Sequence, residues 1–169
     1  MAGNRSKDDG ECEGKVMSSL SIHSDEHYMR QALKEAEAAF EEKEIPVGAV
    51  VTCQNRIIAR AHNQVQKLND VTAHAEMLAI TAAQNFLGSK YLDQCTLYVT
   101  LEPCTMCAGA LYWSQIARVC YGAKDEKRGY HLANPNILHP QTTLITGLLA
   151  EESSEMIKSF FRKMRGNNS

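Results

Sequence analysis

The order of apolar and polar residues along the chain predicts four helices. The first begins at Ser24 or Asp25, either of which can cap it, and Pro46 stops it. The second begins at His74 and ends near Leu87, before a glycine that suits a helix terminus. The third is expected in the segment CTMCAGALYWS. The last lies near the C-terminus, where four apolar residues share one face that can anchor it: Ile157, Phe160, Phe161 and Met164.

Five apolar runs rich in β-forming residues predict strands. The runs PVGAVVTC and RIIARA are separated by Gln54 and Asn55, a pair that suits a tight hairpin turn. CTLYVTL is typical of a buried strand, ARVCYGA is expected to form another, and TTLITGLL a short one. Residues 124–141, with two prolines and many polar side chains, are expected to form a long loop. Strands that alternate with helices indicate a layered α/β fold.

Length and composition indicate one globular domain. The 169 residues suit a domain over residues 25–165, after a mobile extension of residues 1–24 and before a short tail of residues 166–169. No apolar stretch approaches the ~18 residues of a membrane span. Six scattered cysteines without an export signal favour reduced thiols, so we expect a cytoplasmic protein. The net charge of −2 does not exclude a nucleic-acid partner, because basic residues gather near the C-terminus: Lys158, Arg162, Lys163 and Arg165.

Cys104 and Cys107 lie three residues apart at the start of the predicted third helix. At this spacing both sulfur atoms lie on one side of a helix and can reach one point. The helix N-terminus favours the thiolate, because its free N–H groups and its dipole stabilise negative charge. Such a pair suits a redox function or a metal site, and the pair alone leaves both open.

His74 and Glu76 open the predicted second helix, in the segment TAHAEML. His74 is a candidate metal ligand and Glu76 a candidate proton carrier, although such a pair is more often a solvated helix start. Residues two apart on a regular helix point about 200° apart. Both side chains can therefore face one site only if His74 lies in the first turn, where the chain is still bending into the helix.

One histidine and two cysteines together supply three ligands for tetrahedral zinc and leave the fourth position open, which is typical of a catalytic site. Zinc lowers the pKa of bound water, and an unligated Glu76 can carry the proton to a leaving group. The alternative is a closed structural site. Its fourth ligand would come from one of five residues, of which the three cysteines are more typical of a core: Cys53, Cys95, Cys120, His62 and His131.

A His-x-Glu motif followed by Pro-Cys-x-x-Cys is the signature of zinc nucleobase deaminases. The chain resembles this family, the cytidine/deoxycytidylate deaminase superfamily, from about residue 26 to residue 165. It is more narrowly similar to the bacterial tRNA-specific adenosine deaminases. The matching segments are EIPVGAV, HNQ, TAHAEM, TLYVTLEPCTMCAGA, YGAKDEKRG and SFFRKMR.

The resemblance implies a three-layer α/β/α fold with a central mixed five-stranded sheet, a homodimer and one Zn²⁺ per subunit. It implies deamination of the wobble adenosine of a tRNA to inosine, with release of ammonia. The tRNA is expected to be an arginine tRNA. His74, Cys104 and Cys107 would bind zinc, and Glu76 would carry protons. Asn63 would hydrogen-bond the base or its ribose, and two further residues would contact the anticodon loop: Asp125 at a flanking nucleotide and Arg162 at phosphates.

Two other functions remain open at this point. Trp113 lies where some tRNA-acting members carry a smaller polar residue, and a Tyr-Trp pair here also occurs in guanine deaminases of the same superfamily. A small-base deaminase is therefore the first alternative. A zinc-stabilised binding module is the second, and Glu76 distinguishes it, because a structural zinc site has no need of an unligated carboxylate.

Overall fold

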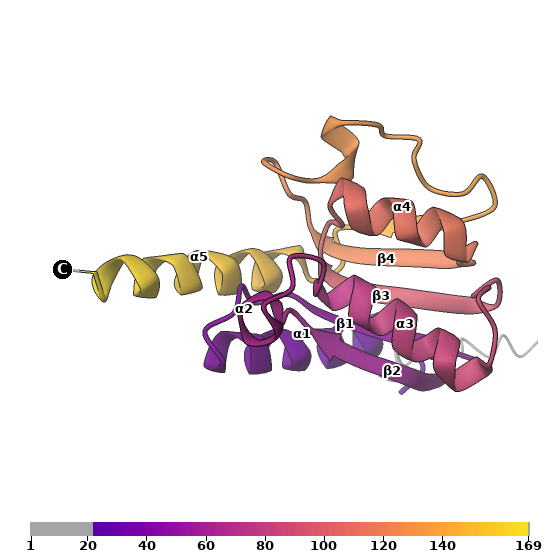
Figure 1. Ribbon diagram of the computed structural model, residues 1–169, viewed down its shortest axis with the longest axis horizontal. Helices are drawn as coiled ribbons and strands as arrows, with labels where there is room; N and C mark the ends of the chain where they lie inside the picture. Colours follow the sequence, from indigo (N-terminus) through magenta and orange to yellow (C-terminus); the bar gives the residue numbers. More distant parts are fainter. Residues whose placement is uncertain (1–21, 169) are drawn as a thin grey trace, which may run out of the picture.

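The computed structural model describes residues 22–168 and forms three layers, with a central sheet between two layers of helices (Figure 1). The sheet has five strands in the order β2-β1-β3-β4-β5. Strand β1 is antiparallel to both β2 and β3, whereas β3, β4 and β5 run parallel. The strands are Gly48–Cys53 (β1), Arg56–His62 (β2), Cys95–Leu101 (β3), Arg118–Ala123 (β4) and Thr143–Thr146 (β5).

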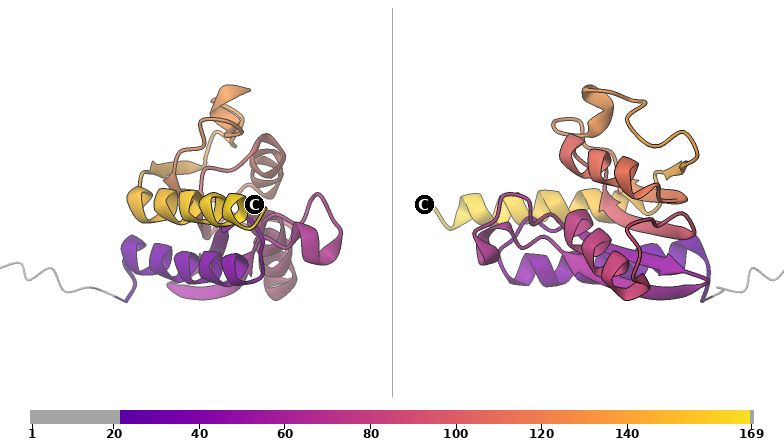
Figure 2. Two further views of the ribbon diagram at one scale, coloured as in Figure 1. Left: turned by 90° about the vertical axis from the view of Figure 1, so that its left-hand side faces the viewer. Right: turned by 45° about the vertical axis from the view of Figure 1, so that its right-hand side comes forward.

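The helices cover the two faces of the sheet in pairs. Helices α1 and α5 lie on one face, and α3 and α4 lie on the other (Figure 2). This arrangement confirms the predicted three-layer α/β/α fold with a mixed sheet. The helices are Asp25–Glu41 (α1), Val65–Leu68 (α2), Ala75–Leu87 (α3), Thr105–Ser114 (α4) and Ala150–Gly166 (α5), with a short 3-10 turn at Tyr130–Leu132.

Local signals in the sequence set the boundaries of these elements. Ser24 caps α1, because its hydroxyl accepts a hydrogen bond from the His27 backbone N–H at 3.1 Å. Gln54 and Asn55 both have positive φ, 51° and 61°, which closes the predicted hairpin between β1 and β2. Gly88 ends α3 in the left-handed conformation, as expected.

Helix α1 packs onto the sheet at unusually short range. A Cβ atom added to Gly48 of β1 would lie 2.0 Å from the carbonyl oxygen of Ala32 and 2.4 Å from the backbone nitrogen of Ala36. At Gly48 the face of α1 therefore presents alanines, and the closest contact there is backbone against backbone. The hydrophobic core on the opposite face of the sheet contains Val51, Leu97 and many other apolar side chains.

The C-terminal helix departs from its prediction. Only Phe160 of the four expected anchors is fully buried, at 6% exposure, and it packs against Phe40 of α1. Phe161 and Met164 stay 41% and 38% exposed. The reason is visible in Figure 1, where the far half of α5 extends past the sheet and has no layer to pack against.

The polar segment expected to be a loop after β2 contains the single-turn helix α2. Cys95 and Cys120 are buried in the core as predicted, and Cys53 is half-buried. The predicted extension lies outside the described residues except for residues 22–24. None of the helices within residues 22–168 has both the length and the apolar character that a membrane span requires.

Candidate active site

The N-termini of α3 and α4 meet on one side of the sheet. His74 is the residue before α3 and Cys104 the residue before α4, and both have extended backbone, with ψ of 153° and 171°. The chain therefore enters each helix from a bend. This is the geometry in which His74 and Glu76 can face one site although they are only two residues apart.

The site brings His74, Cys104 and Cys107 together. The Nδ1 atom of His74 lies 3.6 Å from the Sγ atom of each cysteine. One ligand atom from each of the three residues lies within 4.8 Å of the others. Tetrahedral zinc with ordinary bond lengths would place a nitrogen and a sulfur ligand about 3.6 Å apart. The three residues therefore fit zinc without rearrangement.

The alternative of a closed four-ligand site lacks a fourth ligand in residues 22–168. His62 instead contacts the carboxylates of Glu35 and Glu42. His131 contacts the carboxylate of Glu102. His74, Cys104 and Cys107 form the one group of metal-ligating residues within residues 22–168, so this part of the chain supplies three ligands and no fourth.

The pKa values of the two thiols are shifted in opposite directions. The pKa of Cys104 is lowered to about 4, chiefly by its hydrogen bond with Cys107 and further by His74. The pKa of Cys107 is raised, because a second thiolate would lie against the first and away from water. A divalent cation between the sulfur atoms would remove that repulsion and deprotonate both. The charge of the donor set thus also fits zinc.

Glu76 is buried beside these ligands without being one of them. It is only 4% exposed, and burial raises the pKa of its carboxyl to about 7. The pKa of His74 is also raised, first because it is hydrogen-bonded to Cys104, while its burial and the Arg128 charge oppose the rise. Glu76 is thus a buried ionisable group next to the candidate metal site and outside its group of ligands, the arrangement expected of a proton carrier.

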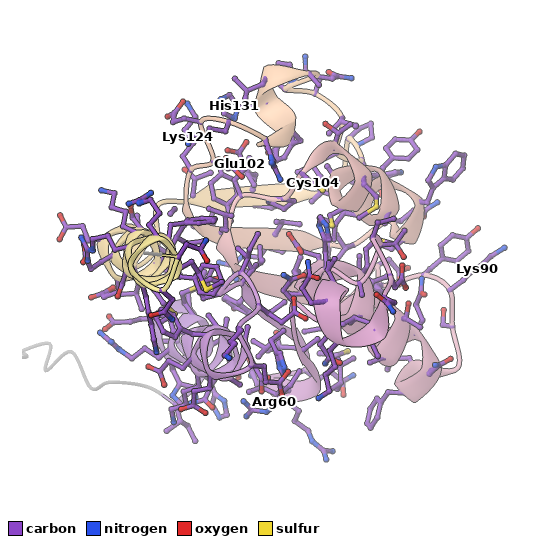
Figure 3. All side chains as sticks on the ribbon, turned by 60° about the vertical axis from the view of Figure 1, so that its left-hand side comes forward. Arg60, Lys90, Glu102, Cys104, Lys124 and His131 are labelled. Carbon is purple, nitrogen blue, oxygen red and sulfur yellow. The ribbon has the colours of Figure 1, made fainter. Side chains whose placement is uncertain are left out.

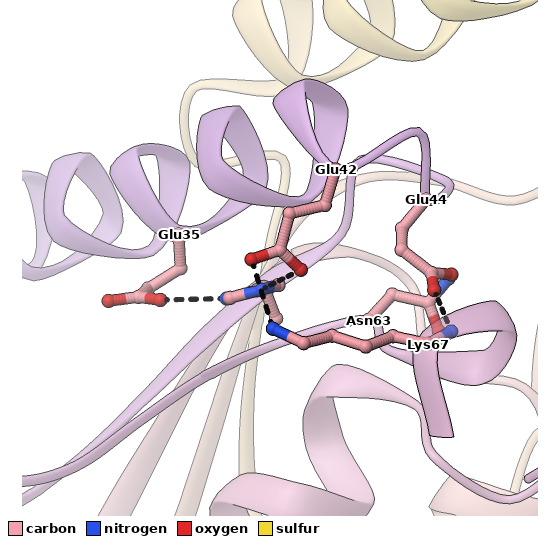
Figure 4. A network of polar contacts seen from close by, with 6 residues as sticks. Glu35, Glu42, Glu44, Asn63 and Lys67 are labelled. Carbon is pink, nitrogen blue, oxygen red and sulfur yellow. Dashed lines mark hydrogen bonds and ion pairs between the residues drawn. The ribbon is translucent and has the colours of Figure 1, made fainter. Parts of the chain in front are cut away.

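Asn63 lies at the end of β2 in a polar network with Glu44 (Figure 4). Its Nδ2 atom donates to Glu44 Oε2 at 3.5 Å, and the Lys67 backbone N–H donates to Glu44 Oε1 at 2.8 Å. Glu44 is 2% exposed, so it acts as a buried hub that orients Asn63 and the start of α2. Sequence reasoning missed Glu44, because nothing separates it from its many exposed acidic neighbours.

The other two predicted site residues have different surroundings. The Asp125 carboxylate accepts hydrogen bonds from the backbone N–H groups of Lys127 and Arg128, both at 3.0 Å, so it shapes its own loop. Arg162 forms an ion pair with Glu155 on α5, at 2.5 Å. Helix α5 belongs to the layer opposite α3 and α4 (Figure 2), so Arg162 is not part of the group around His74.

Comparison with known proteins agrees with this geometry. The family model of the cytidine and deoxycytidylate deaminase zinc-binding region matches residues 22–123. The chain therefore belongs to this deaminase family, as its motifs predicted.

Within that family the similarity is narrower. The chain is 47% identical over 146 residues to the tRNA-specific adenosine deaminase of Aquifex aeolicus, covering 84% of this chain and 97% of the relative. A solved structure from a study of A-to-I editing by tRNA:A34 deaminases is 44% identical, with a TM-score of 0.71, and covers 77% of this chain and 98% of its own. A guanine deaminase from Nitrosomonas europaea is 25% identical, with a TM-score of 0.72, covering 81% and 84%.

Proposed function

We propose that this protein deaminates the wobble adenosine of a tRNA hydrolytically, to give inosine and ammonia. The observation that carries the proposal is the group of His74, Cys104 and Cys107 with the unligated, buried Glu76 beside it. The similarity to tRNA-specific adenosine deaminases over most of both chains supports the substrate class.

The chain's own residues supply binding and proton transfer. His74, Cys104 and Cys107 would hold the zinc, which would supply the Lewis acid that activates water for attack at C6 of adenine. Glu76 would take one proton from the attacking water and deliver it to N1 of the base, and would then pass the remaining hydroxyl proton to the departing amino group, which leaves as ammonia. The Asn63 Nδ2 group donates to Glu44. The Oδ1 atom of Asn63 is therefore left to accept a hydrogen bond from the substrate.

Recognition of the anticodon loop falls to exposed basic residues. Lys158, Arg162, Lys163 and Arg165 lie on α5. The exposed Phe161 and Met164, which have no protein layer to pack against, are available to the RNA on the same helix. Phosphate contacts of this kind release counterions, so activity should fall steeply with added salt. We infer that the substrate is an arginine tRNA from the resemblance to the bacterial tRNA-specific adenosine deaminases.

The test compares zinc-loaded wild type with Glu76→Ala on the anticodon stem-loop of an arginine tRNA. We expect inosine from the wild type and a loss of at least ~10²-fold in kcat for the variant, with zinc content and fold retained. Near-normal turnover of zinc-loaded Glu76→Ala would refute the mechanism. Free guanine, adenosine and cytosine serve as competing substrates, and ammonia from guanine with an untouched stem-loop would refute the substrate.

A guanine deaminase remains the second candidate. Tyr112 and Trp113 at the end of α4 favour it, as does the similarity to the Nitrosomonas europaea guanine deaminase. The higher identity to tRNA-specific deaminases weighs against it.

We also propose that the protein is a homodimer. Helix α4 presents Trp113, Tyr112 and Met106 with 78%, 38% and 37% exposure, an apolar surface that a second copy would cover. Sedimentation at micromolar concentration tests this, and a monomer would contradict it.

A further inference from the structure

Glu102 is a buried carboxylate next to the metal ligands that the chemistry above does not use. It follows β3 directly and precedes Pro103 and Cys104 in the chain. Its side chain is fully buried, at 0% exposure. Figure 3 shows it beside His131 and near Cys104. A buried carboxylate is costly unless hydrogen-bond donors satisfy it, so its partners indicate what it is for.

All of its donors come from one segment, residues 124–132. Oε2 accepts from the Asp125 backbone N–H at 2.9 Å. Oε1 contacts the Nδ1 atom of His131 at 2.6 Å and the His131 backbone N–H at 3.3 Å. The two oxygen atoms therefore bind opposite ends of the segment. A single side chain closes it into a loop.

Backbone contacts seal the same loop against the cysteine ligands. Gly129 forms an isolated β-bridge with Cys104, and the Tyr130 N–H donates to the Pro103 carbonyl at 2.9 Å. A Cβ atom on Gly129 would lie 2.3 Å from Glu102 Oε2. The loop is therefore packed against the carboxylate so tightly that only glycine fits at this point.

The tip of this loop is exposed and carries charge. Lys127 and Arg128 are exposed, and the Asp125 carboxylate holds their backbone N–H groups. Arg128 directly precedes Gly129, which pairs with Cys104, so the tip is close to the metal site. The Glu102 carboxylate thus sets where these charged residues stand relative to the base that reacts.

We infer that Glu102 is a positioning residue: it presets the 124–132 loop so that Asp125 and Arg128 meet the nucleotides that flank the target base. This inference rests on the proposed function, because flanking nucleotides exist only in an RNA substrate. Glu102 acts through the loop and does not itself touch the reacting atoms.

The substitution Glu102→Gln tests it with little change in volume. A carboxylate only accepts hydrogen bonds, whereas a glutamine amide turns its NH₂ toward the backbone N–H of either Asp125 or His131, so one of these two N–H groups loses its acceptor and that end of the loop is held less firmly. We expect KM for the anticodon stem-loop to rise about tenfold or more, because a buried donor loses its partner. We expect kcat to change by less than about threefold, since Glu76 and the zinc ligands stay in place.

Three further measurements separate positioning from a general structural role. Trypsin should cut the released loop at Lys127 or Arg128 faster in Glu102→Gln, and zinc content should stay at one equivalent. The wild type should deaminate stem-loops with a changed flanking nucleotide more slowly than the original stem-loop. This difference in rate should be smaller for the variant. Gly129→Ala should reproduce this pattern, because its Cβ meets the same carboxylate.

The matched control is Glu126→Gln in the same loop. The Glu126 side chain is 74% exposed, and its Oε1 atom lies 3.9 Å from Lys124 Nζ. The substitution therefore removes one charge from the loop and breaks no buried contact. It should keep wild-type KM, discrimination and trypsin resistance. Glu102→Gln with wild-type KM and discrimination, or with lost zinc, would overturn the inference. A wild type that leaves the stem-loop untouched would instead overturn the proposed function, and the inference with it.

Discussion

Gly48→Ala is the substitution whose effect on stability follows most directly from the structure. The added methyl group would lie 2.0 Å from the Ala32 carbonyl oxygen and 2.4 Å from the Ala36 nitrogen, whereas real Cβ atoms essentially never approach closer than 3.0 Å. Both obstacles are backbone atoms of α1, so no side chain can turn aside. Helix α1 must move away from β1 by about 1 Å to admit the methyl group.

The cost follows from what α1 buries. Six of its residues are buried against the sheet: Tyr28, Met29, Ala32, Leu33, Ala36 and Ala39. Burial of three large and three small side chains stabilises the fold by about 8 kcal/mol. A gap of 0.5–1 Å forfeits roughly a quarter to a half of each contact energy. The expected destabilisation is therefore about 2–4 kcal/mol.

Urea denaturation followed by circular dichroism measures this change in the free energy of unfolding. Gly166→Ala at the end of α5 is the control, because a Cβ there has nothing within 4 Å. It should change stability by less than about 0.5 kcal/mol. A destabilisation of less than about 1 kcal/mol for Gly48→Ala would show that α1 adjusts freely and that the backbone contact does not limit the fold.

Two further predictions concern the metal and the pH dependence of stability. Cys107→Ala should abolish zinc binding and lower the melting temperature, whereas Cys120→Ser in the core should keep one equivalent of zinc; metal analysis with the opposite pattern would refute the ligand assignment. The Arg118 guanidinium lowers the pKa of Asp25, so the pair stabilises the fold above the ordinary aspartate pKa and loses this effect as pH falls through the lowered value. Asp25→Asn should therefore be less stable than wild type at pH 7, with a difference that shrinks toward pH 3 in urea titrations; an unchanged difference would contradict the role of the pair.

Much of the fold was predictable from local patterns. The hairpin at Gln54 and Asn55, the cap at Ser24 and the end of α3 at Gly88 depend on residues within a few positions of each other, and the structure contains all three. Hydrophobic periodicity predicted the strands for the same reason, since burial of one face imposes a repeat that is visible in the sequence.

The metal site was predictable in part. The spacing of Cys104 and Cys107 at a helix start places both sulfur atoms on one side, so their pairing is a local property. Their meeting with His74, thirty residues away, depends on which strands lie side by side. The motif resemblance supplied that step, and the sheet order confirms the fold that allows it.

The sequence alone determined the five strands, the four long helices, the deaminase family and the candidate ligands. The tertiary structure decided which acidic residues are buried: Glu44, Glu76 and Glu102 are 2–4% exposed, in a chain with 20 acidic residues. It also decided that the end of α5 lacks a packing partner. Burial of a charged side chain leaves no repeat in the sequence, because it depends on donors brought from distant segments, as the Asp125 and His131 N–H groups are brought to Glu102.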